Sequence, residues 1–499
     1  MHVGIPVVPI SPAYSLMSQD YGKLRGIIEP VKPGLIFVQD GYKFVKAISS
    51  LELGDAEIVV STNPPGGINN VALFDTLCSV SPKQAVDKAF SKVGPDTIAK
   101  ILFTSGSTGQ PKGVINTQRM LCSNQVAMSQ VWTFLNDRPP ITLDWLPWNH
   151  TFGGNHNLNM MLRNGGTMYV DAGKPAPGLI EQTVANLKEI SPTIYFNVPR
   201  GYEMLLPYLE KDEELRQSFF ADLDILFYAA AALTQNAWER LEKQSEATIG
   251  KRVMMVAGWG ATETAPDCTH VYWPIERAGV IGLPIPGTEL KLVPNEEKME
   301  IRVRGPNVTP GYWKRDDLTE AAFDEDGFYC IGDAAKFADN NEPRKGIVFD
   351  GRVSENFKLS TGTWVFVGSL RTRVVSAAAN IIQDAAIAGH DREFLGLLIF
   401  PNVAGCRMLC PELEHEDSIE KMLQSQKVVD ALKVAIRNYN EHSFGSSTRI
   451  ARALMMVDPP NIDAGEITDK GYLNQRAVLT RRADLVEKLY SDDPSVIVF

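Results

Sequence analysis

The segment Thr104–Gly113 combines residue types that bind phosphate groups. It reads TSGSTGQPKG, follows the apolar run 101–103 and precedes a helical pattern that starts near Asn116. Glycines allow backbone N–H groups to converge on an anion, hydroxyl groups add donors, and Lys112 adds a mobile positive charge. The segment lacks the closing GK[ST] of a Walker A loop. We therefore predict a loop that binds a polyphosphate; the alternative is a surface loop rich in small residues.

A second segment, Gly258–Pro266, reads GWGATETAP and follows the apolar run Val253–Ala257. Ligands of open α/β sheets bind at the carboxyl ends of the strands. There, the hydroxyl of Thr262 can bond a phosphate oxygen, and the carboxylate of Glu263 can hold Mg²⁺. Taken alone, the segment is also compatible with an ordinary strand-to-helix turn.

Two further segments could bind the sugar of a nucleotide. Gly327–Ala334 reads GFYCIGDA, and Gly351–Gly362 reads GRVSENFKLSTG. Asp333 follows a predicted strand, where its carboxylate can accept hydrogen bonds from both ribose hydroxyls, and Arg352 could add a ribose or phosphate contact. Because Gly-Asp is also common in turns, the order and spacing of all four segments carry the evidence.

The residues between these segments alternate between two kinds of pattern. Helical patterns such as Leu179–Ile190 and Gln235–Glu246 separate short apolar or β-branched runs. The runs are Leu143–Leu146, Thr167–Val170, Thr193–Val198, Ile225–Ala230 and Val253–Ala257. Strands that alternate with helices of this length indicate βαβ units and a mostly parallel sheet.

The pattern changes near Arg277, beyond which short strands are separated by turn residues as far as Asp350. Such spacing indicates an antiparallel sheet or a small barrel. We predict an α/β protein with two domains. Residues 1–350 would form a large N-terminal domain with mostly parallel sheets plus a small antiparallel barrel-like part, and residues 351–499 a small mobile α+β domain.

Composition restricts the class of protein. The 499 residues carry a net charge of −11, which argues against nucleic acid or an anionic membrane as the main partner. No apolar run reaches the about 18–20 residues of a membrane span, and no secretory signal precedes the first strand, so we expect a cytoplasmic protein. The six cysteines form no CxxC pair and the seven histidines do not cluster beside them, which argues against a structural zinc site.

In this order, the four segments resemble those of the adenylate-forming superfamily, which comprises acyl-CoA synthetases, luciferases and peptide-synthetase adenylation domains. Further matches are LPWNHTFGG at Leu146–Gly154, the small residues Ala229–Ala232 and GPNVTPGYW at Gly305–Trp313. The resemblance covers about three quarters of the chain, from about Leu102 to near Arg476. Within the superfamily, FKLSTGTWV at Phe357–Val365 and GEITDKGYLNQRAV at Gly465–Val478 are most similar to feruloyl-CoA synthases.

The resemblance implies that a carboxylate attacks the α-phosphate of ATP, giving an acyl-adenylate and pyrophosphate. Thr262 would contact the α-phosphate, Glu263 would bind Mg²⁺, and Asp333 would bind ribose with Arg352 nearby. The β- and γ-phosphates would be held by Thr104, Ser105, Gly106, Ser107, Thr108, Gly109 and Lys112. The adenine and acyl slots would be walled by Ala229, Ala230 and Ala231 together with Gly258, Trp259 and Gly260.

The resemblance also assigns a position between the acyl site and the phosphates to His150, whose alternative role is a core histidine bonded to backbone. For the second half-reaction, it places a hinge at Ser354, where the family more often has Asp or Lys. Lys358 and Gly362 would then line the channel for the thiol of CoA.

The chain departs from the family at both ends. The C-terminal signature usually places the adenylation lysine directly after a glycine, but here Glu466 follows Gly465. Lys470 is the candidate instead, with a solvated surface lysine as the alternative. At the other end, Ile5–Ile10 is predicted to be a buried strand, and the family's region upstream of it has no counterpart. We expect a truncated gene or a chain that lacks part of its sheet.

The expected activity is an acid–thiol ligase that forms the CoA thioester of a hydroxycinnamate such as ferulate or p-coumarate. Planar acids would stack on aromatic walls, for which the candidates are Trp148, Phe152, Phe196, Tyr228 and Trp259. The alternatives are a ligase for medium-chain or other aryl acids, a peptide-synthetase adenylation domain, and a catalytically dead fragment that acts as a binding protein. No carrier-domain serine motif follows, which disfavours the peptide-synthetase domain.

Overall fold

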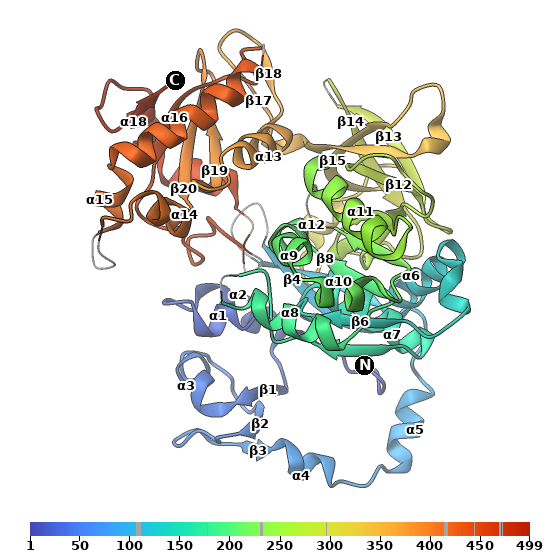
Figure 1. Cartoon of the computed structure of the whole chain (residues 1–499). Helices are drawn as coiled ribbons and strands as arrows, with labels where there is room; N and C mark the ends of the chain where they lie inside the picture. Colours follow the sequence, from blue (N-terminus) through green and yellow to red (C-terminus); the bar gives the residue numbers. More distant parts are fainter. Residues whose placement is uncertain are drawn as a thin grey trace. The chain divides into compact units, whose positions relative to one another are not determined.

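A computed structural model describes residues 1–105, 111–176, 178–229, 233–295, 297–413, 418–443, 445–468, 471 and 473–499. The chain forms two compact units, each with its own sheets (Figure 1). The large unit comprises Met1–Leu16, Tyr21–Ile331 and Ala335–Phe349. The small unit comprises Met17–Asp20, Gly332–Ala334 and Asp350–Phe499.

The main sheet of the large unit has the strand order β13-β14-β15-β16-β12-β11-β10-β9-β8. Its parallel part is formed by β8 (Ile194–Asn197), β9 (Ile225–Tyr228) and β10 (Met254–Gly260). Every residue of β8 and β9 is buried, as in strands that are covered on both faces. The helices along this stretch are α8 (Ile180–Glu189), α9 (Pro199–Lys211), α10 (Glu213–Phe220) and α11 (Gln235–Ile249).

Beyond β10 the sheet becomes antiparallel, because β11 runs against β10. The remaining strands are β11 (Asp267–His270), β12 (Val280–Pro284), β13 (Glu289–Asn295), β14 (Lys298–Arg304), β15 (Tyr329–Phe337) and β16 (Ile347–Arg352). Short helical segments in and after this part are α12 (Asp316–Ala321), η4 (Pro343–Lys345) and η5 (Val353–Glu355). The predicted α/β class, with a mostly parallel part and an antiparallel part, is confirmed.

The segment before β8 forms two pairs of strands and the helices around them. β4 (Ile98–Ser105) pairs antiparallel with β5 (Pro111–Thr117), and β6 (Ile141–Asp144) pairs parallel with β7 (Thr167–Val170). The candidate phosphate loop therefore joins two antiparallel strands and does not lead directly into a helix. The helices here are α6 (Gln118–Val131), η1 (Thr133–Asn136), the π-helical segment η2 (Phe152–Asn157) and α7 (Leu158–Asn164).

The first residues differ from the prediction of a buried strand at Ile5–Ile10. They form no regular strand; Val7 makes a single parallel bridge to Lys100, and both Ile5 and Val7 are exposed. Pro6 and Pro9 lack the N–H groups that a ladder of hydrogen bonds needs, which explains the difference.

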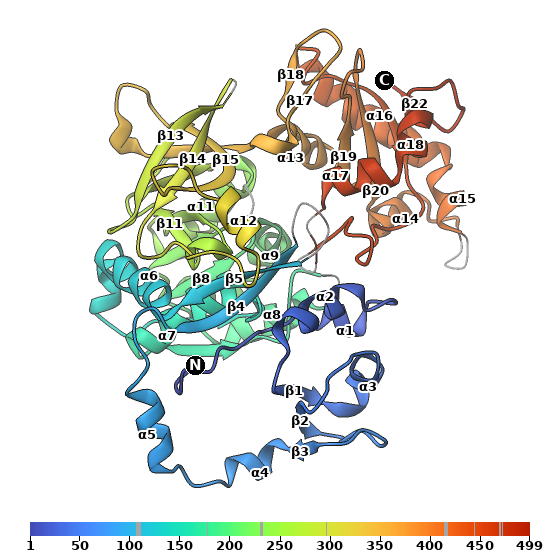
Figure 2. The ribbon, with the colours of Figure 1, turned by 180° about the vertical axis from the view of Figure 1, so that it is seen from behind.

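A small parallel sheet follows in the order β1-β2-β3 (Figure 2). Its strands are β1 (Leu35–Asp40), β2 (Glu57–Thr62) and β3 (Val71–Leu73). The helices of this segment are α1 (Ala13–Leu16), α2 (Gly22–Val31), α3 (Gly41–Ser49), α4 (Phe74–Cys78) and α5 (Gln84–Phe90). None of the described helices is long and apolar enough to cross a membrane.

The small unit is built on a sheet with the order β19-β20-β21-β22, formed by Ile382–Ala388, Leu395–Pro401, Ile450–Met455 and Ile497–Val498. Both faces of β20 are buried. Leu397 packs in a cluster with α13 (Val367–Ala377) and α16 (Gln426–Glu441), whereas Leu398 packs in a second cluster with α17 (Gln475–Arg481) and α18 (Ala483–Leu489). The other elements are β17 (Phe357–Lys358), β18 (Trp364–Val365), α14 (Val403–Leu409) and α15 (Ile419–Leu423). The predicted α+β class of the C-terminal domain is confirmed.

Candidate active site

Two of the segments singled out in the sequence meet at an ion pair. Nζ of Lys112, at the start of β5, lies 3.1 Å from Oε1 of Glu263. Nζ also donates a hydrogen bond of 2.7 Å to Oη of Tyr312, which in turn donates to Oε1 of Glu263 at 2.9 Å. Oη of Tyr329 lies 3.1 Å from Oη of Tyr312. The large unit therefore places a cation, a carboxylate and two phenols within one connected cluster.

The surroundings set the protonation of this cluster. Burial raises the pKa of Tyr312 and of Tyr329, and the negative charge of Glu263 raises both further, so the two phenols keep their protons. Burial alone would lower the pKa of Lys112, but Glu263 and Tyr312 outweigh it and the pKa is raised. Lys112 is therefore a stable cation that can meet a phosphate.

The backbone that carries Glu263 is held by side chains from other elements. η3 (Thr262–Thr264) follows β10, and both Thr262 and Glu263 are buried. Nδ2 of Asn116 donates to the carbonyl of Thr262 at 3.2 Å, and Nδ2 of Asn124 donates to the carbonyl of Thr264 at 3.1 Å. The N–H of Thr309 donates to the carbonyl of Glu263 at 2.7 Å. These bonds fix the position of η3, which is too short to satisfy its own backbone hydrogen-bonding groups.

Two glycines of the same segment are needed for close contacts. A Cβ at Gly260 would collide with the carbonyl of Pro266, and a Cβ at Gly258 would lie 2.9 Å from Nε2 of His270. Packing within the protein therefore requires glycine at these two predicted wall positions, whether or not a ligand binds beside them. Trp259 between them packs in a buried cluster with Ile281 and Tyr329.

The donor set around Glu263 suits Mg²⁺. This ion keeps several waters and uses one or two carboxylates together with substrate phosphates, so a single buried carboxylate beside phenol oxygens is sufficient. Thr104 adds a buried hydroxyl, whose Oγ1 makes no hydrogen bond to another described residue. Its backbone pairs with that of Lys112 across β4 and β5, so both residues flank the candidate phosphate loop.

Several of the predicted residues lie outside the part of the chain that the structure describes: Gly106, Ser107, Thr108, Gly109, Ala230, Ala231 and Lys470. Of Ser105 and Ser354 only the backbone is described. Their proposed contacts with phosphates, adenine and the acyl-adenylate, and the hinge at Ser354, stay predictions. Ala229, the described member of the alanine run, is partly buried beside the core cluster of Phe227 and Val256.

His150 is engaged with the backbone of its own segment. Its Nδ1 accepts a hydrogen bond from the N–H of Phe152 at 3.4 Å, and its carbonyl accepts one from Gly154 at 2.8 Å. In the neutral ring, the proton therefore lies on Nε2. His150 is partly buried and makes the backbone contact foreseen as the alternative, while its position between acid and phosphates stays a prediction.

The two predicted ribose ligands lie beside each other in the small unit. Nε of Arg352 is 3.5 Å from Oδ1 of Asp333, which is buried, whereas the arginine side chain is mostly exposed. In the same unit, Nζ of Lys358 lies 4.7 Å from the ring centroid of Trp364. Gly362 has φ +80° and closes the turn between β17 and β18, which by itself explains a glycine there.

The aromatic residues predicted for the acyl pocket are mostly core residues. Phe152 and Phe196 lie edge to face at 6.4 Å within one buried cluster, and Tyr228 belongs to another. Trp148, by contrast, is exposed. Packing accounts for the buried aromatics, so their part in acid binding stays a prediction.

The residue that replaces the usual lysine after Gly465 has a structural role. Glu466 is buried, and its two carboxylate oxygens accept hydrogen bonds from Arg482 at 2.8 and 2.6 Å. Its Oε2 also accepts a bond from the N–H of Asn461 at 2.9 Å. Glu466 therefore joins the loop between β21 and α17 to the end of α17, and the departure from the family signature does not leave an unpaired charge.

Tyr312 and Tyr329 are the site residues that the sequence analysis missed. Both lie inside segments that it quoted, GPNVTPGYW and GFYCIGDA. Their position inside these segments was the only signal of a role in the site. Aromatic residues in strands and turns usually indicate packing, and only the contacts of their hydroxyl groups distinguish these two tyrosines from core residues.

Comparison with known families agrees with this fold. Residues 1–313 match the model of AMP-binding enzymes, and residues 357–494 match the AMP-binding enzyme C-terminal domain. The chain belongs to the AMP-binding enzyme family. The predicted resemblance to the adenylate-forming superfamily is confirmed, whereas the resemblance to feruloyl-CoA synthases stays a prediction.

Similar curated proteins have several printed activities. The chain is 23% identical to a long-chain-fatty-acid–[acyl-carrier-protein] ligase of Arabidopsis thaliana, over 80% of this chain and 62% of the relative. It is 25% identical to the carboxylic acid reductase of Segniliparus rugosus (85% and 36%). It is also 25% identical to a probable 4-coumarate–CoA ligase of Dictyostelium discoideum (65% and 56%). The chain thus spans less than two thirds of the length of these three relatives.

Solved structures share the fold. ATP-bound MatB from Rhodopseudomonas palustris superposes with a TM-score of 0.64 at 20% identity, over 96% of this chain and 84% of that one. The anthranilate CoA ligase AuaEII in complex with anthranoyl-AMP gives a TM-score of 0.66 at 20% identity, over 97% and 83%. The A domain of the Segniliparus rugosus reductase gives 0.67 at 19% identity, over 96% and 80%.

Proposed function

We propose that this protein is an ATP-dependent acid ligase that activates a carboxylic acid as an acyl-adenylate and releases pyrophosphate. The observation that carries the proposal is the meeting of Lys112 with Glu263, which unites the candidate phosphate loop with the candidate magnesium ligand. Membership of the AMP-binding enzyme family supports it.

In this proposal, the chain orients the phosphates of ATP so that the acid can displace pyrophosphate. Lys112 would contact the β- and γ-phosphates together with Thr104 and the loop residues, and Thr262 would donate its hydroxyl to an oxygen of the α-phosphate. Glu263 would hold Mg²⁺, which would neutralise negative charge on the phosphates. Tyr312 would keep the carboxylate of Glu263 and the ammonium of Lys112 in place by bonding to both.

The carboxylate of the acid attacks the α-phosphorus, the bond to the β-phosphate oxygen breaks, and pyrophosphate leaves. Negative charge grows on the α-phosphate oxygens and the leaving group, and preorganised cations stabilise such charge. Lys470 would supply one of these cations from the small unit. His150, with its exposed side, would line the junction between the acid and the phosphates.

For the second half-reaction we propose CoA as the acceptor and a hydroxycinnamate such as ferulate or p-coumarate as the acid. The thiol sulfur attacks the acyl carbon, and AMP leaves. Lys358 and Gly362 would line the thiol channel after rotation about Ser354. The similarity of Phe357–Val365 to feruloyl-CoA synthases and the relative named as a probable 4-coumarate–CoA ligase support this acid class.

The test is ATP-dependent release of pyrophosphate over a panel of hydroxycinnamic, benzoic and fatty acids, with hydroxylamine added to trap an acyl-adenylate as the hydroxamate. We expect ferulate or p-coumarate hydroxamate and AMP. ADP as the nucleotide product would overturn the mechanism. Turnover of fatty acids alone would overturn the acid class and leave the ligase proposal intact.

The matched control for this assay is Glu263→Gln, which retains the shape of the side chain and removes its charge. Loss of pyrophosphate release in this variant shows that the activity belongs to this site and not to a contaminant. No turnover of any acid by the folded protein would favour the alternative of a binding protein without catalysis.

A further inference from the structure

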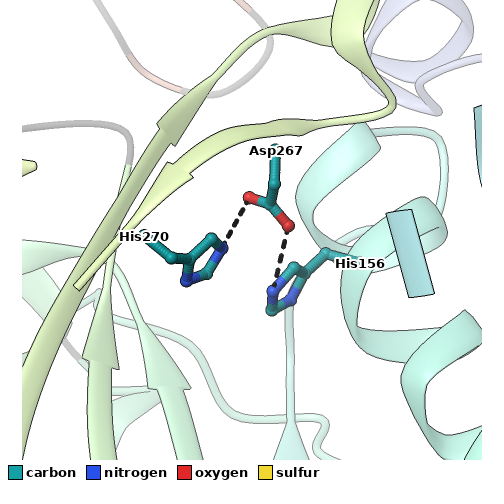
Figure 3. Close-up of side chains that lie close together, drawn as sticks. All are labelled: His156, Asp267 and His270. Atoms are coloured by element: carbon teal, nitrogen blue, oxygen red, sulfur yellow. Dashed lines mark ion pairs between the residues drawn. The ribbon is translucent and has the colours of Figure 1, made fainter. Parts of the chain in front are cut away.

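Three buried side chains of the large unit converge on one another and have no part in the proposed reaction. His156 belongs to η2, and Asp267 and His270 belong to β11. Figure 3 shows both imidazole rings directed at the same carboxylate. Nε2 of His270 lies 3.0 Å from Oδ1 of Asp267, and Nε2 of His156 lies 3.4 Å from Oδ2. All three side chains are almost completely shielded from solvent.

The tautomer of His156 follows from its neighbours. Nδ1 of His156 lies 2.8 Å from Oδ1 of Asn157, and Nδ2 of Asn157 donates to Oδ2 of Asp144 at 2.8 Å. Because the amide nitrogen faces Asp144, the amide oxygen faces His156 and must accept the proton on Nδ1. A neutral His156 therefore presents the lone pair of Nε2 to Asp267.

Nε2 of His156 therefore faces Oδ2 of Asp267 without a proton between them, and neither ring nitrogen of His270 makes a hydrogen bond to another described residue. Nε2 of His156, Nε2 of His270 and Oδ2 of Asp267 make no hydrogen bond to another described residue. Within the described part of the chain, Asp267 also forms no ion pair with a lysine or arginine. A carboxylate that is buried without a cation is strongly unfavourable, so the three atoms call for a positive charge between them.

We propose that His156, Asp267 and His270 bind a divalent transition-metal ion, Zn²⁺ in particular. Their ligand atoms all lie within 4.8 Å of one another. Zinc binds histidine nitrogen and carboxylate oxygen at 2.0–2.2 Å, so two ligands of a tetrahedral ion lie about 3.3 Å apart. Each imidazole is near this separation from one oxygen of Asp267, since Nε2 of His270 lies 3.0 Å from Oδ1 and Nε2 of His156 lies 3.4 Å from Oδ2.

Two further features match a built site. A histidine that binds a metal usually donates its other ring N–H to an oxygen, as His156 does to Asn157. Gly258 leaves the space next to His270 open, because a Cβ there would lie 2.9 Å from Nε2 of the ring. Mg²⁺ and Ca²⁺ prefer all-oxygen shells, so two imidazoles favour zinc over either ion. A water molecule would complete the shell.

The bound metal would hold two segments of the candidate active site. η2 begins two residues after His150, and β11 begins shortly after Thr262 and Glu263. The backbone of Asp267 is already fixed, since its carbonyl accepts bonds from Asn124 at 3.1 Å and from Asn307 at 2.7 Å. The metal therefore has a positioning role. The proposal does not depend on which reaction the protein performs.

The test uses the full chain, purified without a histidine tag and without chelator. Elemental analysis should find about one zinc ion per chain. After removal of metal with 1,10-phenanthroline, Co²⁺ should restore binding with the visible absorption of a four-coordinate site and with no thiolate band. The melting temperature should fall on chelation and recover with either metal.

Variants assign the signal to these residues. Asp267→Asn and His156→Gln should abolish the Co²⁺ absorption, while His390→Gln should retain it. His390 is the matched control, because its Nδ1 lies 3.1 Å from Oδ2 of Asp391 in an exposed His–Asp pair. Absence of zinc from the folded protein together with no Co²⁺ absorption would overturn the proposal. So would absorption that is unchanged in both buried variants.

If a buried variant does not fold, the unmodified protein still decides the question. Zinc that survives gel filtration, together with a melting temperature that phenanthroline lowers, supports the site. A folded protein that is free of zinc and whose melting temperature is the same with and without chelator contradicts it.

Discussion

The ammonium group of Lys112 and the carboxylate of Glu263 form a partly buried ion pair at 3.1 Å. Lys112 belongs to the candidate phosphate loop, and Glu263 follows the last parallel strand of the main sheet. Tyr312 bonds to both groups, so a ligand with phosphate and a metal ion would meet a preformed set of charges.

Glu263→Gln should lower kcat for pyrophosphate release by about 10²–10³, because charge stabilisation by the bound metal is lost. The amide oxygen can still accept from Tyr312, and Lys112 retains access to water, so we expect little change in Tm. Glu276→Gln is the control, since Glu276 is exposed. A loss of Tm as large as the loss of activity would assign Glu263 a structural role instead.

Tyr312→Phe removes the hydroxyl that joins Lys112 to Glu263. Loss of a buried hydrogen-bonding group should lower the free energy of unfolding by about 1–2 kcal/mol, and the KM for ATP should rise more than kcat falls. Chemical denaturation and initial rates at varied ATP measure the two effects. Tyr42→Phe, at an exposed tyrosine, should change neither quantity. An unchanged KM would remove Tyr312 from the nucleotide site.

Lys470→Ala should slow adenylation by about 10²–10³ and leave transfer from pre-formed feruloyl-adenylate to CoA nearly unchanged, because the lysine would act only on the α-phosphate. Lys358→Ala should do the reverse. Single-turnover assays of each half-reaction separate the two. If Lys470→Ala slows neither half-reaction, the lysine is a surface residue and the adenylating cation lies elsewhere.

Glu466→Gln should destabilise the small unit, by about 3 kcal/mol at neutral pH, because Arg482 loses a buried charged partner. Burial alone would raise the pKa of Glu466, but its bonds to Arg482 outweigh this, and the pKa is lowered from 4.5. The folded state therefore binds fewer protons than the unfolded state, and the stabilisation is present above pH 4.5 and lost as the pH falls through the folded pKa.

The difference in unfolding free energy between the original protein and Glu466→Gln should thus shrink on acidification below pH 4.5. Denaturant titrations at several pH values measure it. Glu412→Gln removes an exposed ion pair to Lys427 and should cost little at any pH. A constant difference for Glu466→Gln over this range would show that the ion pair does not contribute.

The sequence by itself determined the class of fold, because hydrophobic periodicity and turn residues act over a few neighbours. β8, β9, β10 and α8 lie where apolar and helical patterns predicted them. It also indicated the candidate phosphate loop and the candidate magnesium segment Thr262–Glu263, because glycines and hydroxyls near one another in the chain stay near one another in space. Local pattern was a poorer guide at Ile5–Ile10, where two prolines prevent a strand.

The tertiary structure alone decided which distant side chains meet. Tyr312 meets Lys112 because the segment after β14 returns to β5, where Tyr312 forms a bridge with Val114, and Tyr329 joins them from β15. His156 lies in a helical segment and Asp267 and His270 in a strand, and no spacing in the chain marks them as a set. The physical reason is that side-chain chemistry depends on distances of about 3 Å, which the packing of whole elements sets and local sequence does not.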